Sequence, residues 1–140
     1  MDILIVTNNP EVADSNKNKG RVLNIYGGAM EVFLAARELV YQGYSLLSHP
    51  LMGSIRPWQN PYRSIVLQKS SPPVRSRNIS LIENAVAMLA DNKEALQERF
   101  SSIETQTLAE YRWLDKELIN QVWDRGSEIW DMGAEIREVE

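Results

Sequence analysis

The chain has 140 residues, a net charge of −4, no cysteine and a single histidine. The length is typical of one domain. The lack of cysteine excludes disulfides, thiolate nucleophiles and sulfur-ligated zinc or iron–sulfur sites within the chain. A single histidine excludes a multi-histidine metal site, so the sequence predicts no metal and no cofactor.

Hydropathy gives no sign of a membrane protein. The first apolar run, residues 3–6, is four residues long and has no basic lead, which argues against a signal peptide. No later run approaches the roughly 18 apolar residues that a spanning helix needs. We therefore predict a cytoplasmic protein that does not contact a membrane.

Charge is distributed unevenly along the chain. Residues 1–77 carry nine Lys or Arg against five Asp or Glu, whereas residues 101–140 carry four against ten. The basic half would attract small anions, and the acidic half would repel nucleic acid. A solvated charge pattern without a function explains the asymmetry about as well. The sequence predicts no nucleic-acid partner.

The first elements are short and separated by turn signals. Residues 2–6 form an apolar, β-branched run typical of a buried strand. Thr7-Asn8-Asn9-Pro10 ends it, because proline cannot donate to a ladder and asparagine suits turns. We expect a polar loop over residues 14–20 and a second strand over residues 22–26.

A helix follows Gly27-Gly28. Apolar residues recur at helical spacing from Ala29 to Val40, and Gly43 supplies a stop. Residues 44–48 then resemble a third strand. A strand, a helix and a strand in so short a span predict a βαβ unit with parallel neighbours. The glycine pair could offer amides to an anion, although a tight strand–helix turn explains it better.

The middle of the chain alternates irregular and extended segments. Residues 49–62 contain three prolines and a glycine, which forbid regular structure. Residues 63–69 resemble a fourth strand, and residues 70–78 a polar connector. The predicted fold is therefore α/β: a small, mostly parallel sheet of about four strands with flanking helices and a helical C-terminal extension.

Helical patterns dominate the rest of the chain. Ser80-Leu81-Ile82-Glu83 has the form of a capping box, and Ser101 with Glu104 repeats it. Apolar residues at spacings of three and four continue to Ile136. We divide the chain into an α/β body, residues 1–100, and an acidic helical extension, residues 101–140, packed on the same domain.

The loop over residues 48–64 is the best candidate site. It follows a strand, and α/β folds place ligands beyond the carboxyl ends of strands. Arginine offers a planar fork for carboxylate or phosphate, and prolines reduce the entropy lost on binding. The alternative is a stiff loop whose polar groups satisfy local partners. The candidate ligand-binding residues are Thr7, Asn8, Asn9, His49, Ser54, Arg56, Asn60, Tyr62 and Arg63.

Two further features carry weaker hypotheses. His49 is the only side chain that titrates near neutral pH, so it is the one candidate general acid or base. A lone histidine is more often structural. Trp113, Trp123 and Trp130 stand in an acidic segment, and two of them are seven residues apart on one helical face. They pack on the body or form a partner or homodimer face, since aromatic residues are enriched at interfaces.

Several segments resemble the GrdX family, small proteins associated with glycine reductase gene clusters. The resemblance covers roughly residues 1–90. It rests on four motifs: Ile5-Val6-Thr7-Asn8-Asn9-Pro10, Leu47-Ser48-His49-Pro50-Leu51-Met52-Gly53-Ser54-Ile55-Arg56-Pro57, Asn60-Pro61-Tyr62-Arg63-Ser64 and Ser80-Leu81-Ile82-Glu83-Asn84. It implies an accessory role in anaerobic amino-acid reduction and no particular mechanism.

These observations give three functional hypotheses. The first is a non-enzymatic accessory protein that binds a small anionic metabolite or a peptide at the 48–64 loop. There, Arg56 and Arg63 would pair the charge while His49 and Ser54 orient the ligand. The second is an interaction module that docks a larger complex through residues 101–140. The third is an enzyme that uses His49 in acid–base chemistry.

Overall fold

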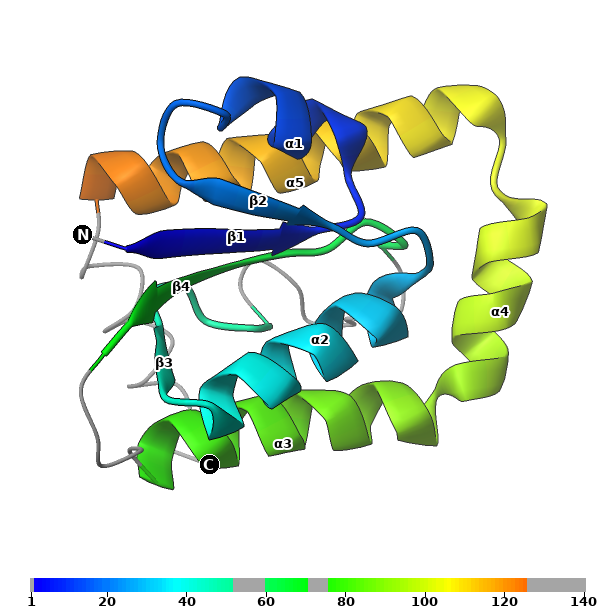
Figure 1. Ribbon diagram of the computed structural model, residues 1–140. Coiled ribbons are helices and arrows are strands. Elements are labelled where there is room, and N and C mark those ends of the chain that lie inside the picture. Colours follow the sequence, from blue (N-terminus) through cyan, green and yellow to red (C-terminus); the bar gives the residue numbers. More distant parts are fainter. Residues whose placement is uncertain (1, 52–59, 71–75, 126–140) are drawn as a thin grey trace.

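A four-stranded sheet lies between two layers of helices (Figure 1). The computed structural model describes residues 2–51, 60–70 and 76–125. Helices α2 (Ala29–Tyr41) and α3 (Ser76–Asp91) cover one face of the sheet. Helices α1 (Pro10–Ser15) and α5 (Thr105–Arg125) cover the other, and α4 (Lys93–Ser102) links the layers.

The four predicted strands are all present, with ends shifted by one or two residues. They are β1 (Ile3–Thr7), β2 (Arg21–Asn24), β3 (Tyr44–Leu46) and β4 (Ser64–Lys69). Their order across the sheet is β2-β1-β4-β3. The α/β class is confirmed.

The sheet is mixed, so the prediction of a mostly parallel sheet was wrong. β1 pairs with β2 in parallel, whereas β4 runs antiparallel to both β1 and β3. No crossover helix separates β3 from β4 among the described residues, so the chain turns back and the two strands pair antiparallel. The expected βαβ neighbours, β2 and β3, lie at opposite edges of the sheet.

Helix α2 follows the prediction closely. Its buried residues are Ala29, Val32, Phe33, Ala36 and Val40, the face expected from their spacing. The Glu31 carboxylate accepts a hydrogen bond of 2.9 Å from the Gly28 amide at the N-terminus. Gly43 has a φ of 107°, a left-handed conformation that glycine adopts without penalty. The predicted stop is therefore real.

Helix α1 was not predicted. Thr7-Asn8-Asn9-Pro10 was predicted to be a break before a loop, but Pro10 is the first residue of a helix. The Asn9 side chain caps it by accepting a 3.0 Å hydrogen bond from the Glu11 amide. Asparagine at the cap and proline at the first position are a helix start signal, because neither position needs an intrahelical donor.

Two predicted helix starts were wrong. Ser80 lies inside α3, which begins at Ser76, and Ser101 lies in the last turn of α4. The capping-box pattern therefore occurs here within helices, where serine side chains do not cap. The later helix begins at Thr105 instead.

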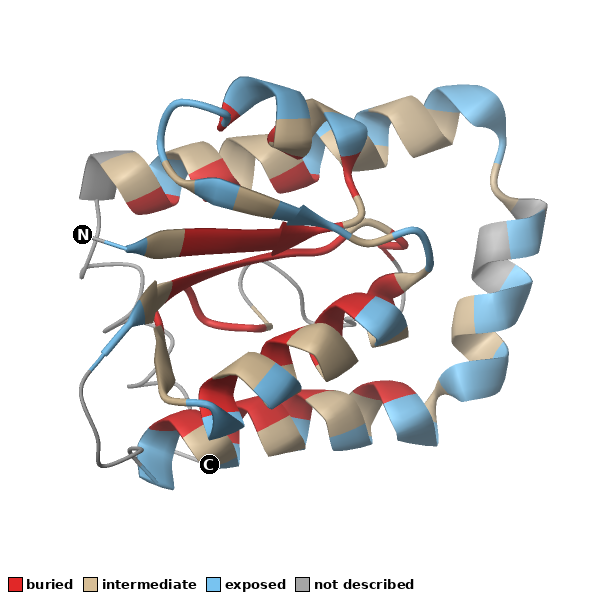
Figure 2. Ribbon diagram, viewed as in Figure 1, coloured by how far each residue is buried: buried red, intermediate tan, exposed pale blue. Residues whose placement is uncertain are grey.

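Each face of the sheet has its own hydrophobic cluster (Figure 2). The larger cluster joins Leu4, Val6 and Leu67 to α2 and α3, with Phe33 and Ile82 fully buried. The smaller one is formed by Ile5, Val12, Val66, Ile119 and Val122. Burial on the second face therefore depends on α5.

Within the part of the chain that the structure describes, no helix combines the length and the apolar character needed to cross a membrane.

Candidate functional site

The candidate site lies at one edge of the sheet, where β1, β2 and β3 end and β4 begins (Figure 1). The segment Thr7-Asn8-Asn9 lies next to the loop before β4. The Asn8 side chain accepts from the Arg63 amide (2.8 Å) and donates to the Pro61 carbonyl (2.9 Å) and to the Gly27 carbonyl (3.0 Å). One side chain thus links the ends of β1 and β2 to the loop that enters β4.

A buried carboxylate, Asp115 of α5, lies beneath this edge. Its Oδ2 accepts hydrogen bonds from the Ser64 hydroxyl (2.7 Å) and from Asn9 Nδ2 (3.0 Å). The Thr7 and Ser64 hydroxyls are 2.7 Å apart. Because the Ser64 proton points to a carboxylate, Thr7 must be the donor to Ser64. The sheet edge and α5 are therefore joined by a directed chain of hydrogen bonds.

Arg63 is the charge partner of this cluster. Both its guanidinium and the Asp115 carboxylate are buried. Burial lowers the pKa of Arg63 to about 10, although attraction to Asp115 opposes the shift. Burial also raises the pKa of Asp115, against the hydrogen bonds from Asn9 and Ser64 and the charge of Arg63. Arg63 remains a cation at neutral pH, and Asp115 is the buried acidic residue that attracts it.

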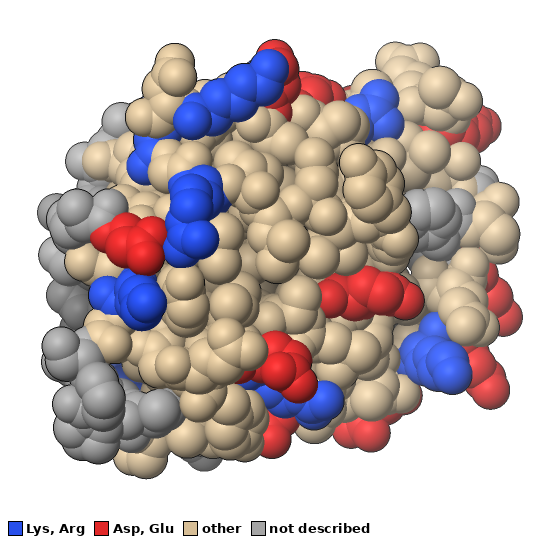
Figure 3. Space-filling model, viewed as in Figure 1, with Lys and Arg blue, Asp and Glu red and all other residues tan. Residues whose placement is uncertain are grey.

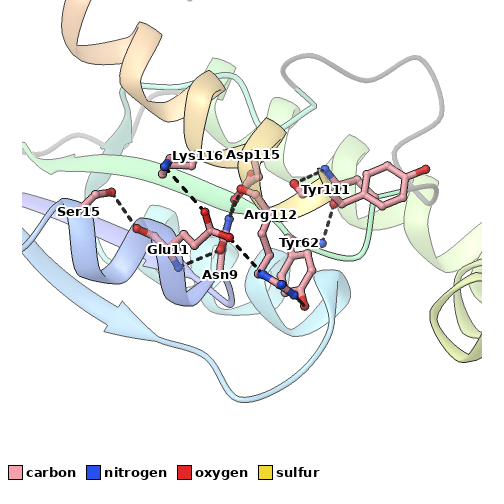
Figure 4. Close-up of polar contacts among 9 residues, drawn as sticks. Asn9, Glu11, Ser15, Tyr62, Tyr111, Arg112, Asp115 and Lys116 are labelled. Carbon is pink, nitrogen blue, oxygen red and sulfur yellow. Dashed lines mark hydrogen bonds and ion pairs between the residues drawn. The ribbon is translucent and has the colours of Figure 1, made fainter. Parts of the chain in front are cut away.

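A second polar network covers the cluster (Figure 4). Arg112 donates to the Tyr62 hydroxyl (3.0 Å) and to Glu11 (3.2 Å). Lys116 approaches the other Glu11 oxygen at 3.8 Å. These groups join α5 to the N-terminus of α1 and to the loop before β4, and they are only partly exposed.

Asn60 and Asn9 add contacts to the backbone of α5. Asn60 Oδ1 accepts from the Tyr62 amide (2.9 Å), and its Nδ2 lies 3.5 Å from the Tyr111 carbonyl. Asn9 Nδ2 donates to the Arg112 carbonyl at 2.9 Å. The loop before β4 is therefore held by α5 as well as by β1.

His49 lies in the short segment after β3 and is buried. Its Nδ1 accepts a 3.1 Å hydrogen bond from the Leu51 amide, which places the proton of the neutral ring on Nε2. The adjacent Ser48 hydroxyl accepts from the Val66 amide of β4 (2.9 Å). Two other candidates, Ser54 and Arg56, lie outside the described residues.

The tryptophans of the C-terminal segment have different environments. The Trp123 indole donates to Asn16 Oδ1 (2.7 Å) and lies 5.4 Å from the Lys19 ammonium, so it packs on the body. Trp113 is 56% exposed on α5, beside Leu114. Trp130 lies outside the described residues.

Five groups of this site were not predicted from the sequence: Glu11, Ser64, Arg112, Asp115 and Lys116. One signal was available for Asp115. It lies between Tyr111 and Ile119 on the stripe that α5 turns toward the sheet, and an acidic residue there must have buried partners. Within the described ranges, no group of three or more His, Cys, Asp or Glu side chains is placed to hold a metal ion.

The raised pKa of Asp115 predicts a pH-dependent stability. The folded state holds this proton more tightly than the unfolded state, where the pKa is about 3.9. The contribution of Asp115 to the free energy of unfolding is thus fully present below its unfolded-state pKa. It is lost as the pH rises through the folded-state pKa. Relative to Asp115→Asn, the wild type should lose free energy of unfolding above pH ~4, by at most about 1.4 kcal/mol per pH unit. Urea unfolding of both proteins over this range measures it, and a difference that rises with pH would contradict the assignment.

Comparison with known proteins gives one match. The model of a family described as GrdX-like protein matches residues 4–124, which include the sheet, both helical layers and every described residue of the candidate site. No curated protein and no solved structure matches the chain.

Proposed function

The chain belongs to the GrdX-like protein family, and from this premise we propose that it is a cytoplasmic accessory protein that binds a small anionic metabolite or a peptide segment. The binding site is the sheet edge formed by Asn8 and the 48–64 loop. The observation that carries the proposal is the position of Asn8, whose side chain fixes three backbone segments around this edge. Rigid loops at the carboxyl ends of strands are where α/β folds bind ligands.

The charge of this edge favours an anion. Two of its described cations, Arg112 and Lys116, share the single carboxylate of Glu11. Arg56, which belongs to the same loop in the sequence, is a further cation that we assign to the site.

Hydrogen bonds and charge place several candidate residues in the frame of the site. Thr7, Asn9 and Asn60 bond to other parts of the protein, and the Arg63 cation is attracted by Asp115. We assign these residues to the frame. As the residues that contact the ligand we propose Arg56, Ser54 and His49, with Arg56 as the charge partner. The association with glycine reductase belongs to the same proposal.

Thermal unfolding against a panel of anions tests this function. The panel contains phosphate, acetyl phosphate, glycine, betaine and short peptides. A ligand present at a hundred times its dissociation constant should stabilise the wild type by about 2.7 kcal/mol. We expect Arg56→Ala to lose this response.

The matched control is Arg37→Ala. Arg37 also carries one positive charge, but it pairs with Glu83 between α2 and α3 at 3.3 Å. This variant should respond as the wild type does. A flat response across the panel, or an equal loss in both variants, would count against a site in the 48–64 loop.

A second candidate function is docking of a larger complex through α5. The favouring observation is that Trp113 and Leu114, neighbours on this helix, are 56% and 41% exposed. Large apolar side chains exposed together are typical of interaction sites. Trp113→Glu separates the two candidates, because it should abolish docking and leave the response to anions unchanged.

A further inference from the structure

β2 is the terminal strand of the sheet and pairs only with β1 among the described strands. A proline, a bulge, an inward charge, a covering segment or a very short length can keep an edge strand from pairing with another chain. β2 is short, at four residues. β2 has the sequence Arg-Val-Leu-Asn, without a proline, and its single charge, Arg21, is bonded to Asp2 at 2.9 Å.

The backbone of β2 offers hydrogen bonds in a defined register. The Ile25 amide donates to the Thr7 carbonyl of β1 at 2.8 Å. In a parallel ladder, the amide and carbonyl groups of alternate residues point to the same neighbouring strand, so the backbone groups of Leu23 also face β1. The amides and carbonyls of Val22 and Asn24 therefore point away from β1, toward solvent. Val22 and Asn24 each offer an outward amide and an outward carbonyl, so a second strand can pair with β2 along this edge.

The side chains along this edge are unusually apolar for a surface. Leu23 is 40% exposed, and Tyr26, two residues after the strand, is 96% exposed. Asn24, the outward residue at the end of β2, is exposed as well. Figure 3 shows the face on which β2 lies, and the centre of this face is free of charged side chains. Charges are found around this area, which leaves an uncharged surface beside the open backbone groups.

We infer that a second copy of this chain pairs with the β2 edge, antiparallel and about a two-fold axis at Leu23. The two sheets would then form one continuous eight-stranded sheet. This dimer uses neither the 48–64 loop nor the exposed face of α5, so it is independent of the proposed function.

The edge is self-complementary in this register. Val22 of each copy lies opposite Asn24 of the other, and both residues have outward backbone groups. Each Val22–Asn24 pair exchanges two hydrogen bonds, so the two symmetry-related pairs form four in total. Leu23 lies opposite Leu23, apolar against apolar. Two-fold closure leaves no open β2 edge, which is the usual form of a small homo-oligomer.

The charges also fit a second copy. Arg21 lies at the start of β2 and would be opposite Ile25 of the other copy rather than opposite its Arg21. Beyond Ile25, the chain reaches Gly28, which is capped by the exposed Glu31 carboxylate at 2.9 Å. The start of one strand therefore lies on the side of the exposed Glu31 of the other copy, while each Arg21 keeps its own bond to Asp2 and is not opposite a second Arg21.

Cysteine cross-linking tests the register, and the chain has no cysteine of its own to interfere. Facing residues that do not exchange hydrogen bonds have Cα atoms about 4.5 Å apart, a distance that a disulfide spans. The full-length Leu23→Cys protein should therefore oxidise to a covalent dimer. Asn24→Cys is the matched control on the same strand, because its two copies would lie diagonally, roughly 7–8 Å apart. It should cross-link at least tenfold more slowly.

Light scattering of the unmodified protein tests the association itself. We expect a dimer for the wild type and for Trp113→Glu, and a monomer for Leu23→Glu, with unchanged far-ultraviolet circular dichroism in all three. A monomeric wild type at every concentration would overturn the inference. So would a dimer that survives Leu23→Glu, or one that Trp113→Glu abolishes, since the latter would place the interface on α5. Equal cross-linking of the two cysteine variants would overturn the register.

Discussion

Asp115→Ala is expected to lower the free energy of unfolding by about 3–5 kcal/mol, the usual effect of removing one of two buried opposite charges. The variant removes the buried carboxylate that attracts the Arg63 cation. It also removes the acceptor of the Ser64 hydroxyl and one acceptor of Asn9. Urea unfolding at neutral pH measures the loss.

Three further variants show whether the two buried charges are the cause: Glu11→Ala, Arg63→Met, and Arg63→Met combined with Asp115→Ala. Glu11→Ala removes a carboxylate from the partly exposed network above and should cost at most about 1 kcal/mol. Arg63→Met combined with Asp115→Ala removes both charges, so it should be more stable than Asp115→Ala alone. If the double variant shows the sum of the two single losses, the two side chains do not interact and the assignment fails.

The strands and α2 could be predicted because their signals are local. The apolar run over residues 3–6 forms a strand wherever it is buried, and the spacing from Ala29 to Val40 fits only a helix. Gly43 ends α2 because its positive φ suits glycine. None of these inferences needs knowledge of distant residues.

The direction and order of the strands could not be predicted in this way. Whether β4 runs parallel or antiparallel to β1 depends on the path of residues 47–63, which have no periodicity. The sequence analysis also joined β2 and β3 into one βαβ unit, although β1 and β4 lie between them. Adjacency in a sheet is a property of the whole chain, and no single window of sequence contains it.

The location of the candidate site was predicted from the sequence, but its hydrogen-bond partners were not. Asn8 and Arg63 were both among the candidate residues, and the structure joins them by two hydrogen bonds. The Arg63 amide donates to the Asn8 side chain, and the Asn8 amide donates to the Arg63 carbonyl. Asp115 was missed because it lies more than 100 residues from Asn9, its hydrogen-bond partner. Periodicity marked its helix as amphipathic but gave no indication of which part of the sheet it would cover.

The contribution of α5 changes how the candidate edge is understood. From the sequence, the 48–64 loop and the acidic C-terminal segment carried two separate hypotheses. In the structure, Tyr111, Arg112 and Asp115 hold the loop before β4 from one side while Asn8 holds it from the other. A partner that moved α5 would therefore also disturb the loop, which couples the two surfaces physically.

Asn8→Ala is the second variant with a large expected effect. It leaves the Arg63 amide and the Pro61 carbonyl, both partly buried, without the partners they now have. Each buried polar group left unsatisfied costs about 1–3 kcal/mol, so for these two groups we expect a loss of about 2–6 kcal/mol in the free energy of unfolding. The response to anions should fall as well, because the loop before β4 is no longer fixed to β1. Urea unfolding and thermal shifts with the anion panel measure the two effects.

Asn92→Ala is the matched control. The Asn92 side chain is also partly buried, but it donates one local hydrogen bond, to the Met88 carbonyl at 2.8 Å. Its loss should cost about 0.5–1.5 kcal/mol and leave anion binding intact. If Asn8→Ala costs no more than this control and still responds to the same anions, Asn8 does not organise the edge. The ligand contacts would then lie elsewhere on the protein. A large loss of stability with an unchanged anion response would show that Asn8 stabilises the fold without organising the binding site. The site would then lie in a part of the loop that does not depend on Asn8.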